Sequence, residues 1–375
     1  MALRIFFFLL CLSFAKNNFS QFYIRGHVTD SENQLPLKGA SVYINNTTKG
    51  TTTDDNGDFQ LGPFQPGQYE VVASYVGYEA LLYSAEVKTA DFRIRFKLNK
   101  KELILREVLV LSSATRKQYL DLFRKYVLGV TVAADHCKVE NLEDIQFTLG
   151  DTKDEILAFS EKELVIENPD LGYTLYFELV DFYYNKLTSG SYFFGYTRYV
   201  DWAKDEQAKK KWLKKRRQAY IGSTVHFFRS LVKKELTKEG FTVYHLDKSQ
   251  RLKKDTLVAK TPLQKANAGV HVPMKAVEDS MIRLYPDSSF LIYELCLMDG
   301  WRIIYKNSTT LKTEIQRKSF MMQPPTGTMT GLRLREAPVL ITGRGMLLTP
   351  IRVYYDGVWA YERLANMLPE DYEPE

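Results

Sequence analysis

The chain has few of the residues and motifs on which catalytic and metal sites are usually built. Among its 375 residues are only three cysteines and five histidines. It contains no His-Glu-x-x-His run, no Gly-x-Ser-x-Gly elbow and no phosphate-binding glycine loop, which are motifs of zinc peptidases, serine hydrolases and nucleotide-binding proteins. The sequence therefore gives no catalytic, cofactor-binding or metal-ligating residues to predict, and we expect that the protein is not an enzyme and uses no cofactor.

The nearest approach to a metal-ligand cluster is His136 beside Cys137, with Glu140 close by in the sequence. A structural zinc site needs four such ligands at defined spacings, and the sequence does not supply them here. We interpret these residues as buried or capping side chains.

Long apolar runs are also scarce. After the N-terminus, no stretch is long and apolar enough to predict a transmembrane helix. Residues 1–15, MALRIFFFLLCLSFA, combine basic Arg4 with an apolar run over 5–14 and small residues before Lys16, which is the pattern of a cleaved signal peptide. We expect export across one membrane. The alternatives are a buried N-terminal element and a lipoprotein site at Cys11.

Removal of the signal peptide would leave two cysteines, Cys137 and Cys296. An oxidising compartment would allow one disulfide between them, and two free, buried thiols are the alternative. We favour free thiols, because a chain of this length can bury enough apolar surface without a covalent link.

What the chain has in excess is aromatic side chains, with 24 Tyr and 22 Phe. Broad side chains pack well on a pleated sheet, so this excess favours β-structure. The net charge of +6 is modest for the length and does not by itself imply a polyanionic partner. The length predicts two domains.

Residues 21–112 repeat short alternating segments that are separated by turn residues. In FRIRFKL, the apolar residues Ile94, Phe96 and Leu98 alternate with basic ones, which is typical of a strand with one buried face. Turn signals recur at the spacing of sandwich domains. We therefore predict an antiparallel β-sandwich over 21–112.

The segment DDNGD within this region resembles a calcium loop, because Asp54, Asn56 and Asp58 carry oxygen atoms at alternate positions. An EF-hand loop, however, needs Gly at its sixth position and Glu at its twelfth. Here Gly57 is fourth and Gln65 is twelfth. Asn-Gly favours the positive φ of a tight hairpin turn, so we predict a structural turn.

The same region resembles the carboxypeptidase regulatory-like domain. The matching motifs are Gly-x-Val-x-Asp at 26–30, Pro-Leu-x-Gly-Ala-x-Val at 36–42, Gly-Thr-x-Thr-Asp at 50–54, Pro-Gly-x-Tyr at 66–69 and Ser-Tyr-Val-Gly-Tyr at 74–78. The resemblance implies a seven-stranded prealbumin-like sandwich that is an accessory domain and not a peptidase. Such domains are also common ahead of TonB-dependent outer-membrane receptors.

The rest of the chain predicts a mixture of helices and strands. The segment 113–129 has apolar residues such as Phe123 and Val127 at helical spacing and ends at Gly129, so we expect a connecting helix. Residues 130–375 predict one α+β domain, rich in antiparallel strands and carrying a basic helical hairpin. The fold class is therefore mainly β, with an α+β second domain.

The predicted hairpin is strongly basic in its first helix, where Trp212 is expected to be a core residue. The second helix is expected to begin after Ser223 and to end at Gly240, because these residues favour helix termini. The residues that could bind an anionic membrane surface are Lys210, Lys211, Lys214, Lys215, Arg216 and Arg217. A solvated helix face is the simpler interpretation. An exported protein seldom meets nucleic acid, so we predict no nucleic-acid partner.

Several later segments resemble uncharacterised envelope proteins of Bacteroidota-type Gram-negative bacteria. They are HCKVEN, LVIENPDLGYTLYFELVDF, WLKKRRQAYIGSTVHFFRSLVKKELTKEGF and DGVWAYERLANMLPEDYEP. The resemblance implies a place in the periplasm or at the outer membrane or cell surface. It implies no activity and no functional residues.

Together these observations favour a non-catalytic binding or docking module for an envelope protein or a glycan, with a TonB-dependent transport system as one candidate partner. The alternative is a hydrolase on glycan or peptide with its site in residues 130–375. Carboxylates such as Glu178 and Asp181 are of the type that glycosidases use, but spacing in the sequence does not give their separation in space.

Overall fold

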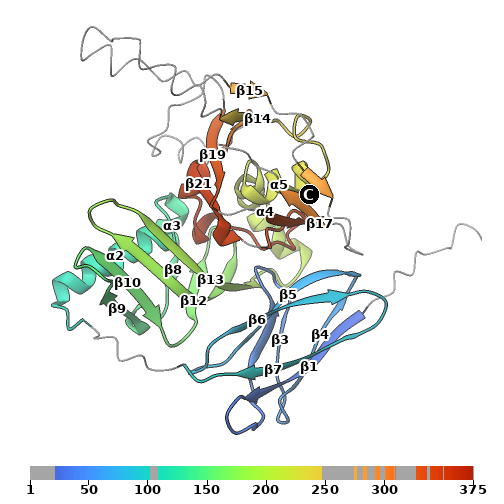
Figure 1. Ribbon diagram of the computed structural model, residues 1–375, viewed down its shortest axis with the longest axis vertical. Coiled ribbons are helices and arrows are strands. Elements are labelled where there is room, and N and C mark those ends of the chain that lie inside the picture. The colour runs from blue at the N-terminus through green and yellow to red at the C-terminus, as the bar shows by residue number, and fades with distance from the viewer. Residues whose placement is uncertain are drawn as a thin grey trace, which may run out of the picture.

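The computed structural model describes residues 22–101, 109–246, 274–276, 282–284, 292–295, 300–307, 309, 327–335, 338–348 and 350–374. The predicted signal peptide, residues 1–15, and Cys296 lie outside the described residues. Three hydrophobic cores organise the described part of the chain. Figure 1 shows them as a blue sandwich, a green sheet with its helices, and a yellow-to-red unit.

The N-terminal unit is the predicted β-sandwich. Its strands are β1 (Phe22–Asp30), β2 (Ser41–Ile44), β3 (Gly50–Thr52), β4 (Asp58–Phe64), β5 (Gly67–Ser74), β6 (Leu81–Val87) and β7 (Phe92–Leu98). One sheet has the order β4-β1-β7 and the other β3-β2-β5-β6. The strand pattern that predicted it holds in β7, where Ile94, Phe96 and Leu98 are buried. The pairing is not antiparallel throughout, because β1 and β7 run parallel.

The DDNGD segment is a turn, as predicted, but it is not a hairpin. It connects β3 in one sheet to β4 in the other. The Asp54 side chain accepts hydrogen bonds of 2.9 Å from the backbone N–H groups of Asn56 and Asp58. Gly57 has a φ of 78°, and a Cβ atom there would lie 2.6 Å from the Val28 carbonyl oxygen. The acidic residues therefore shape the backbone of this turn.

The middle unit is a six-stranded antiparallel sheet covered by a helix. Its elements are α2 (Ser113–Val127), α3 (Val132–His136), β8 (Lys138–Val139), η1 (Leu142–Asp144), β9 (Ile145–Leu149), β10 (Glu155–Ser160), β11 (Leu164–Asn168), β12 (Tyr173–Asn185) and β13 (Ser191–Asp201). The order is β8-β11-β12-β10-β9, with β13 also paired to β12. Helix α2 buries Phe123 against Phe182 of β12, with ring centroids 5.0 Å apart. This is the predicted connecting helix, and it belongs to the middle core.

The predicted helical hairpin consists of α4 (Glu206–Tyr220) and α5 (Thr224–Val232). Ser223 caps α5 as predicted, because its side chain accepts from the His226 N–H group. The predicted end of this helix at Gly240 is wrong. Lys234 takes a φ of 58°, which leaves the helical region, so α5 stops at Val232 and Gly240 directly precedes strand β14.

The third unit contains β14 (Phe241–Leu246), β15 (Met274–Ala276), β16 (Ile282–Leu284), β17 (Ile292–Leu295), β18 (Trp301–Tyr305), β19 (Thr328–Leu334), β20 (Val339–Thr342), η5 (Pro350–Arg352), β21 (Val353–Gly357), α8 (Val358–Tyr361) and η6 (Leu364–Asn366). Its sheets have the orders β15-β14-β18-β19-β21 and β16-β17-β20. Residues 130–375, predicted as one domain, thus hold two cores. The C-terminal segment returns to the middle core, where Leu364 and Tyr372 are buried.

The loop between β2 and β3 joins the sandwich to the other units. Asn46 donates its N–H to the Thr197 carbonyl oxygen of β13 at 2.7 Å, and its own carbonyl accepts from the Glu370 N–H at 2.7 Å. The sandwich also contacts β12, where Glu178 accepts from Lys101 at 2.8 Å and from Ser74 at 3.0 Å. Among the described helices, none is long and apolar enough to cross a membrane.

Candidate functional site

Two cavities lie where the units meet, which is where ligand sites often form. A cavity of about 500 Å³, the junction pocket, lies between the sandwich, the turn after β20 and the C-terminal segment. A second cavity of about 380 Å³, the aromatic cleft, lies between the start of β13, the α4–α5 corner and residues 350–372. The aromatic cleft is the candidate site, because its lining combines ring faces with polar groups.

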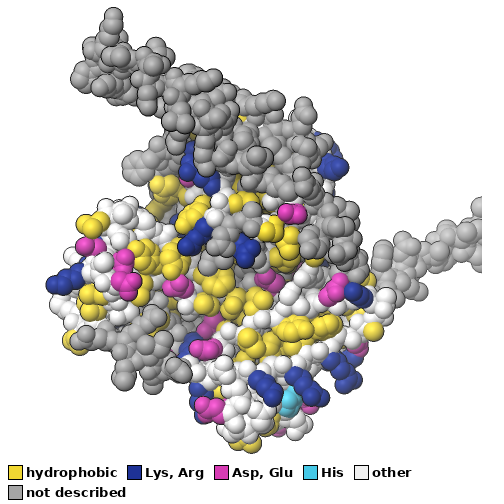
Figure 2. Space-filling model, in the orientation of Figure 1, with side chains coloured by type: hydrophobic (Ala, Val, Ile, Leu, Met, Phe, Trp, Pro, Cys, Tyr) yellow, Lys and Arg dark blue, Asp and Glu magenta, His cyan; other side chains and the backbone are white. Residues whose placement is uncertain are grey.

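The aromatic cleft draws its lining from segments that are far apart in the sequence. The long β12–β13 pairing carries residues 191–194 to one wall. The return of the C-terminal segment supplies the opposite wall. Figure 2 shows hydrophobic and basic side chains lying together where that segment meets the middle sheet. The aromatic residues of the lining are Tyr192, Phe193, Phe194, Tyr220, Tyr354, Tyr355, Trp359 and Tyr372.

Tyr192 is the most clearly positioned of these rings. It stacks on Tyr183, with ring centroids 5.4 Å apart and planes 14° from parallel. Its hydroxyl donates a hydrogen bond of 2.8 Å to the Asp181 carboxylate. Burial, together with this bond, raises the pKa of Tyr192 to about 12. The side chain is nevertheless 43% exposed, so one face of a fixed ring remains open to a ligand.

The opposite wall contains a second exposed ring and a buried one. Tyr354 is 57% exposed. Trp359, also in the lining, is buried, and its indole N–H donates to the Gly222 carbonyl oxygen at 2.8 Å. Tyr355 meets Trp359 edge to face, with centroids 5.7 Å apart. The cleft thus has rigid aromatic surfaces, because each buried ring is held by packing or by a hydrogen bond.

Two arginines supply hydrogen-bond donors to the cleft. Arg335 and Arg363 form no ion pair with any carboxylate in the part of the chain that the structure describes. The Arg363 guanidinium lies 5.5 Å from the centroid of the Phe193 ring. Burial lowers the pKa of Arg363. Guanidinium groups without a fixed partner can donate to oxygen atoms of a ligand.

The structure separates the carboxylates Glu178 and Asp181. Asp181 lines the aromatic cleft, whereas Glu178 is buried against the sandwich and paired with Lys101. A β-bulge between Leu179 and Asp181 shifts the register at this point of β12. These two groups therefore contact different partners and do not form the pair that a glycosidase needs.

The basic residues of α4 do not all share one surface. Lys210, Lys211, Lys214 and Arg217 are exposed, and Lys215 is paired with Asp170 at 2.5 Å. Arg216 does not belong to the predicted anionic-binding surface, because its side chain is 1% exposed. It binds Asp201 through two nitrogens, at 2.7 and 2.8 Å. Binding of an anionic surface by the exposed lysines stays a prediction.

Trp212 is buried, as predicted, and its indole N–H donates to the Pro169 carbonyl oxygen at 3.0 Å. The His136 ring lies 3.2 Å from the Asp170 carboxylate. Cys137 has a free, buried thiol, as predicted, and burial raises its pKa to about 12. The described residues contain no group of three His, Cys, Asp or Glu side chains that could hold a metal ion.

Sequence reasoning missed the aromatic cleft. The excess of tyrosine and phenylalanine was its only signal, and that excess predicted β-structure instead. No local pattern joins Tyr192 to Tyr354, because the return of the C-terminal segment brings them to one cavity.

Comparison with solved structures gives partial similarities. The TIE protein of Bacillus anthracis is 26% identical over 22% of this chain and 17% of that chain, with a TM-score of 0.20. The major pilin subunit of Bacillus cereus is 18% identical over 22% of this chain and 30% of that one, with a TM-score of 0.19. A type II cohesin-X-dockerin complex from Acetivibrio cellulolyticus is 17% identical over 29% of this chain and 76% of that one, with a TM-score of 0.20. The chain thus spans less than a third of the first two proteins.

A search of curated proteins gave no significant match. A family model does match the sandwich, in agreement with its strand content and with the motifs found in the sequence. Residues 24–110 match the model of the CarboxypepD_reg-like domain, which is a regulatory-like domain of non-catalytic type.

Proposed function

We propose that this chain is an exported, non-catalytic glycan-binding protein of a Gram-negative cell envelope, and that the aromatic cleft holds the glycan. The observation that carries the proposal is the pair of exposed rings, Tyr192 and Tyr354, at one cleft with polar groups between its walls. The match of residues 24–110 to a non-catalytic domain type supports the binding role.

The chemistry of the cleft suits a sugar. The C–H faces of a pyranose ring are apolar and pack on aromatic faces, while its hydroxyl groups need hydrogen-bond partners at the edge. Asp181 can accept such bonds, and Arg335 can donate them. Tyr183 and Asp181 hold the Tyr192 ring in place, so little side-chain freedom is lost when a ligand binds.

Binding of envelope oligosaccharides to the purified chain tests this proposal by calorimetry. Replacing Tyr192 or Tyr354 with alanine should weaken binding by about fivefold, because loss of one ring contact costs about 1 kcal/mol. Tyr83→Ala is the matched control, since this tyrosine is 45% exposed on β6, in the sandwich. Equal affinities for all three variants and the wild type would reject the cleft as the glycan site.

The same samples address the alternative of a hydrolase. Glu362 also lines the cleft that holds Asp181, so a second carboxylate is present there. We expect no new reducing ends when the bound oligosaccharide is incubated with the wild-type chain. Steady release of reducing ends, lost in Asp181→Asn, would instead establish glycosidase activity.

The sandwich would then serve to dock the chain on an envelope protein, such as a component of a TonB-dependent transport system. Strand β6 lies at one edge of its sheet, and Leu81 and Tyr83 on it are exposed. An exposed edge strand can pair with a strand of a partner. Photocrosslinking from position 83 in cells, followed by mass spectrometry, should yield one dominant protein, and its absence would argue against docking at this edge.

A further inference from the structure

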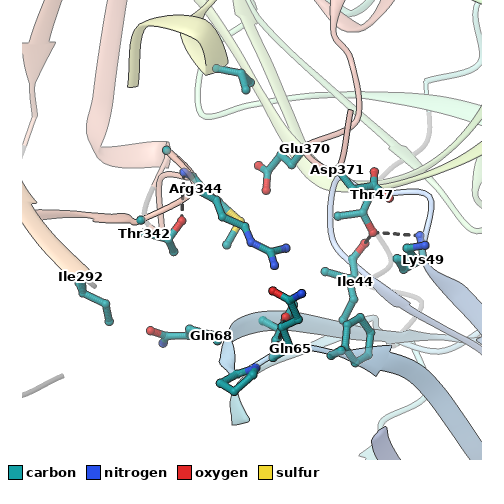
Figure 3. Close-up of a pocket in the computed structure, with 18 of the residues that line it drawn as sticks. Ile44, Thr47, Lys49, Gln65, Gln68, Ile292, Thr342, Arg344, Glu370 and Asp371 are labelled. Carbon is teal, nitrogen blue, oxygen red and sulfur yellow. Dashed lines mark hydrogen bonds between the residues drawn. The ribbon is translucent and has the colours of Figure 1, made fainter. Parts of the chain in front are cut away.

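The junction pocket has a composition unlike that of the aromatic cleft. Its walls come from the sandwich, from the turn after β20 and from the C-terminal segment (Figure 3). Apolar side chains such as Phe64, Ile292 and Met346 make up one part of the lining, and Arg344, Gln65 and Glu370 are among the polar groups.

Arg344 is one of two basic residues that line this pocket, with Lys49. Its guanidinium and the Gln65 side chain point towards each other across the pocket (Figure 3). It lies 5.8 Å from the centroid of the Tyr69 ring. Among the described residues, no carboxylate forms an ion pair with it. Arg344 is exposed to solvent at the pocket, so its guanidinium is accessible to a ligand, and its planar fork fits carboxylate oxygens in pairs.

The turn that carries Arg344 is held in one conformation. The Gly345 N–H donates to the Thr342 carbonyl oxygen at 2.8 Å, and the Met346 N–H donates to the Thr342 hydroxyl at 3.2 Å. Arg229 of α5 donates to the Arg344 carbonyl oxygen at 3.3 Å. A Cβ atom on Gly345 would lie 2.6 Å from the Arg229 nitrogen. The backbone that carries Arg344 is therefore fixed.

Neither acidic residue of the pocket forms an ion pair with Arg344 among the described residues. Asp371 is occupied by Thr48, whose N–H and hydroxyl both donate to its carboxylate. Burial raises the pKa of Glu370 well above its ordinary value, so its carboxyl keeps a proton to higher pH and can donate a hydrogen bond. The lining thus combines hydrogen-bond donors with apolar side chains.

We propose that the junction pocket binds a small organic carboxylate, with its carboxylate on Arg344 and its apolar part against Phe64 and Met346. This site is separate from the aromatic cleft and does not depend on glycan binding. Because the sandwich and the C-terminal segment both contribute walls, a bound carboxylate would also join these two parts of the molecule.

The test uses the whole exported chain with hexanoate as the probe, and hexanamide and hexyl phosphate for comparison. Calorimetry or NMR titration should show saturable, millimolar binding of hexanoate, as expected for so small a ligand. Hexanamide has the same shape without the charge and should bind about tenfold more weakly or worse. Equal binding of hexanamide, or binding of hexyl phosphate without hexanoate, would overturn the proposal.

Two variants of Arg344 identify the group that binds. Arg344→Gln should lose hexanoate binding by about tenfold or more, and Arg344→Lys should fall between that variant and the wild type, since it keeps the charge but not the fork. Arg95→Gln is the control, because Arg95 is exposed on the outer face of β7. Unchanged unfolding midpoints would show that all variants fold. If Arg344→Gln binds hexanoate with the affinity of the wild type, Arg344 does not hold the carboxylate and the proposal is wrong.

Discussion

The hydroxyl of Thr48 donates a hydrogen bond of 2.5 Å to the carboxylate of Asp371, across 323 positions of sequence. The Thr48 N–H group donates to the same carboxylate at 3.0 Å. Beside this contact, the Asn46 carbonyl accepts from the Glu370 N–H at 2.7 Å. One loop of the sandwich is thereby bound to the C-terminal segment, which forms walls of both cavities.

Loss of the Asp371 carboxylate should weaken this junction. Asp371→Ala removes the acceptor for both groups of Thr48, and hydrogen bonds to a charged group contribute about 1.5–3 kcal/mol. We expect the free energy of unfolding to fall by about 2 kcal/mol in urea denaturation. Asp55→Ala is the control, since Asp55 is paired with Lys38 at an exposed site. Equal stability of the two variants would show that the Asp371 contact does not hold the junction.

Arg216 should be essential to the middle unit although it lies in a run of surface cations. Its guanidinium binds Asp201 and also donates to the carbonyl oxygens of Leu171 and Gly172. It lies 3.9 Å from the centroid of the Tyr173 ring. Arg216 is buried and Asp201 is 30% exposed. Hydrogen bonds to a charged group contribute about 1.5–3 kcal/mol, so Arg216→Met should lower the free energy of unfolding by about that amount.

Lys210→Met is the matched variant for this measurement, because Lys210 is exposed on the same helix. It should change the unfolding free energy by less than about 0.5 kcal/mol. Similar losses in the two variants would mean that the ion pair with Asp201 contributes little to the stability of the unit.

Arg216 and its neighbours in α4 show which structural roles could be predicted from the sequence. Charge alone does not distinguish Arg216 from Lys215 or Arg217. Its position in the helix does distinguish it, because Arg216 follows Trp212 by one helical turn and lies on the same buried face of α4. Its partner Asp201 belongs to β13, and nothing in the local sequence predicts that contact.

The sandwich was predictable because apolar and polar residues alternate along its strands. Ile94 and Phe96 face the core in β7, and turn residues such as Gly57 mark where the chain reverses. The parallel pairing of β1 with β7 was not predictable, since it joins the two ends of the unit. The aromatic cleft escaped prediction for the same reason, because Tyr192 and Tyr354 meet only through the long-range return of the chain.

Glu370 should make the stability of the molecule fall as pH rises. Burial is the largest cause of its raised pKa, and the Glu70 carboxylate adds to it, whereas Arg229 opposes it. The folded state therefore binds more protons than the unfolded chain between 4.5, the ordinary pKa of this group, and the raised value. In that window the free energy of unfolding decreases with increasing pH, and below it the contribution is constant. The charged groups around Glu370 are Glu70, Asp371, Arg229, Arg344 and Lys49.

Replacing Glu370 with glutamine isolates this contribution. Each unit by which the pKa is raised costs about 1.4 kcal/mol once the carboxyl ionises, and a neutral amide avoids that cost. Glu370→Gln should therefore match the wild type near pH 4 and exceed it in thermal unfolding midpoint near pH 8. Glu373→Gln, at a side chain that is 83% exposed, should show no such divergence. If Glu370→Gln is instead less stable than the wild type at pH 8, the ionised carboxylate is a stabilising partner of Arg229 or Arg344, and the junction depends on charge pairing rather than on a protonated acid.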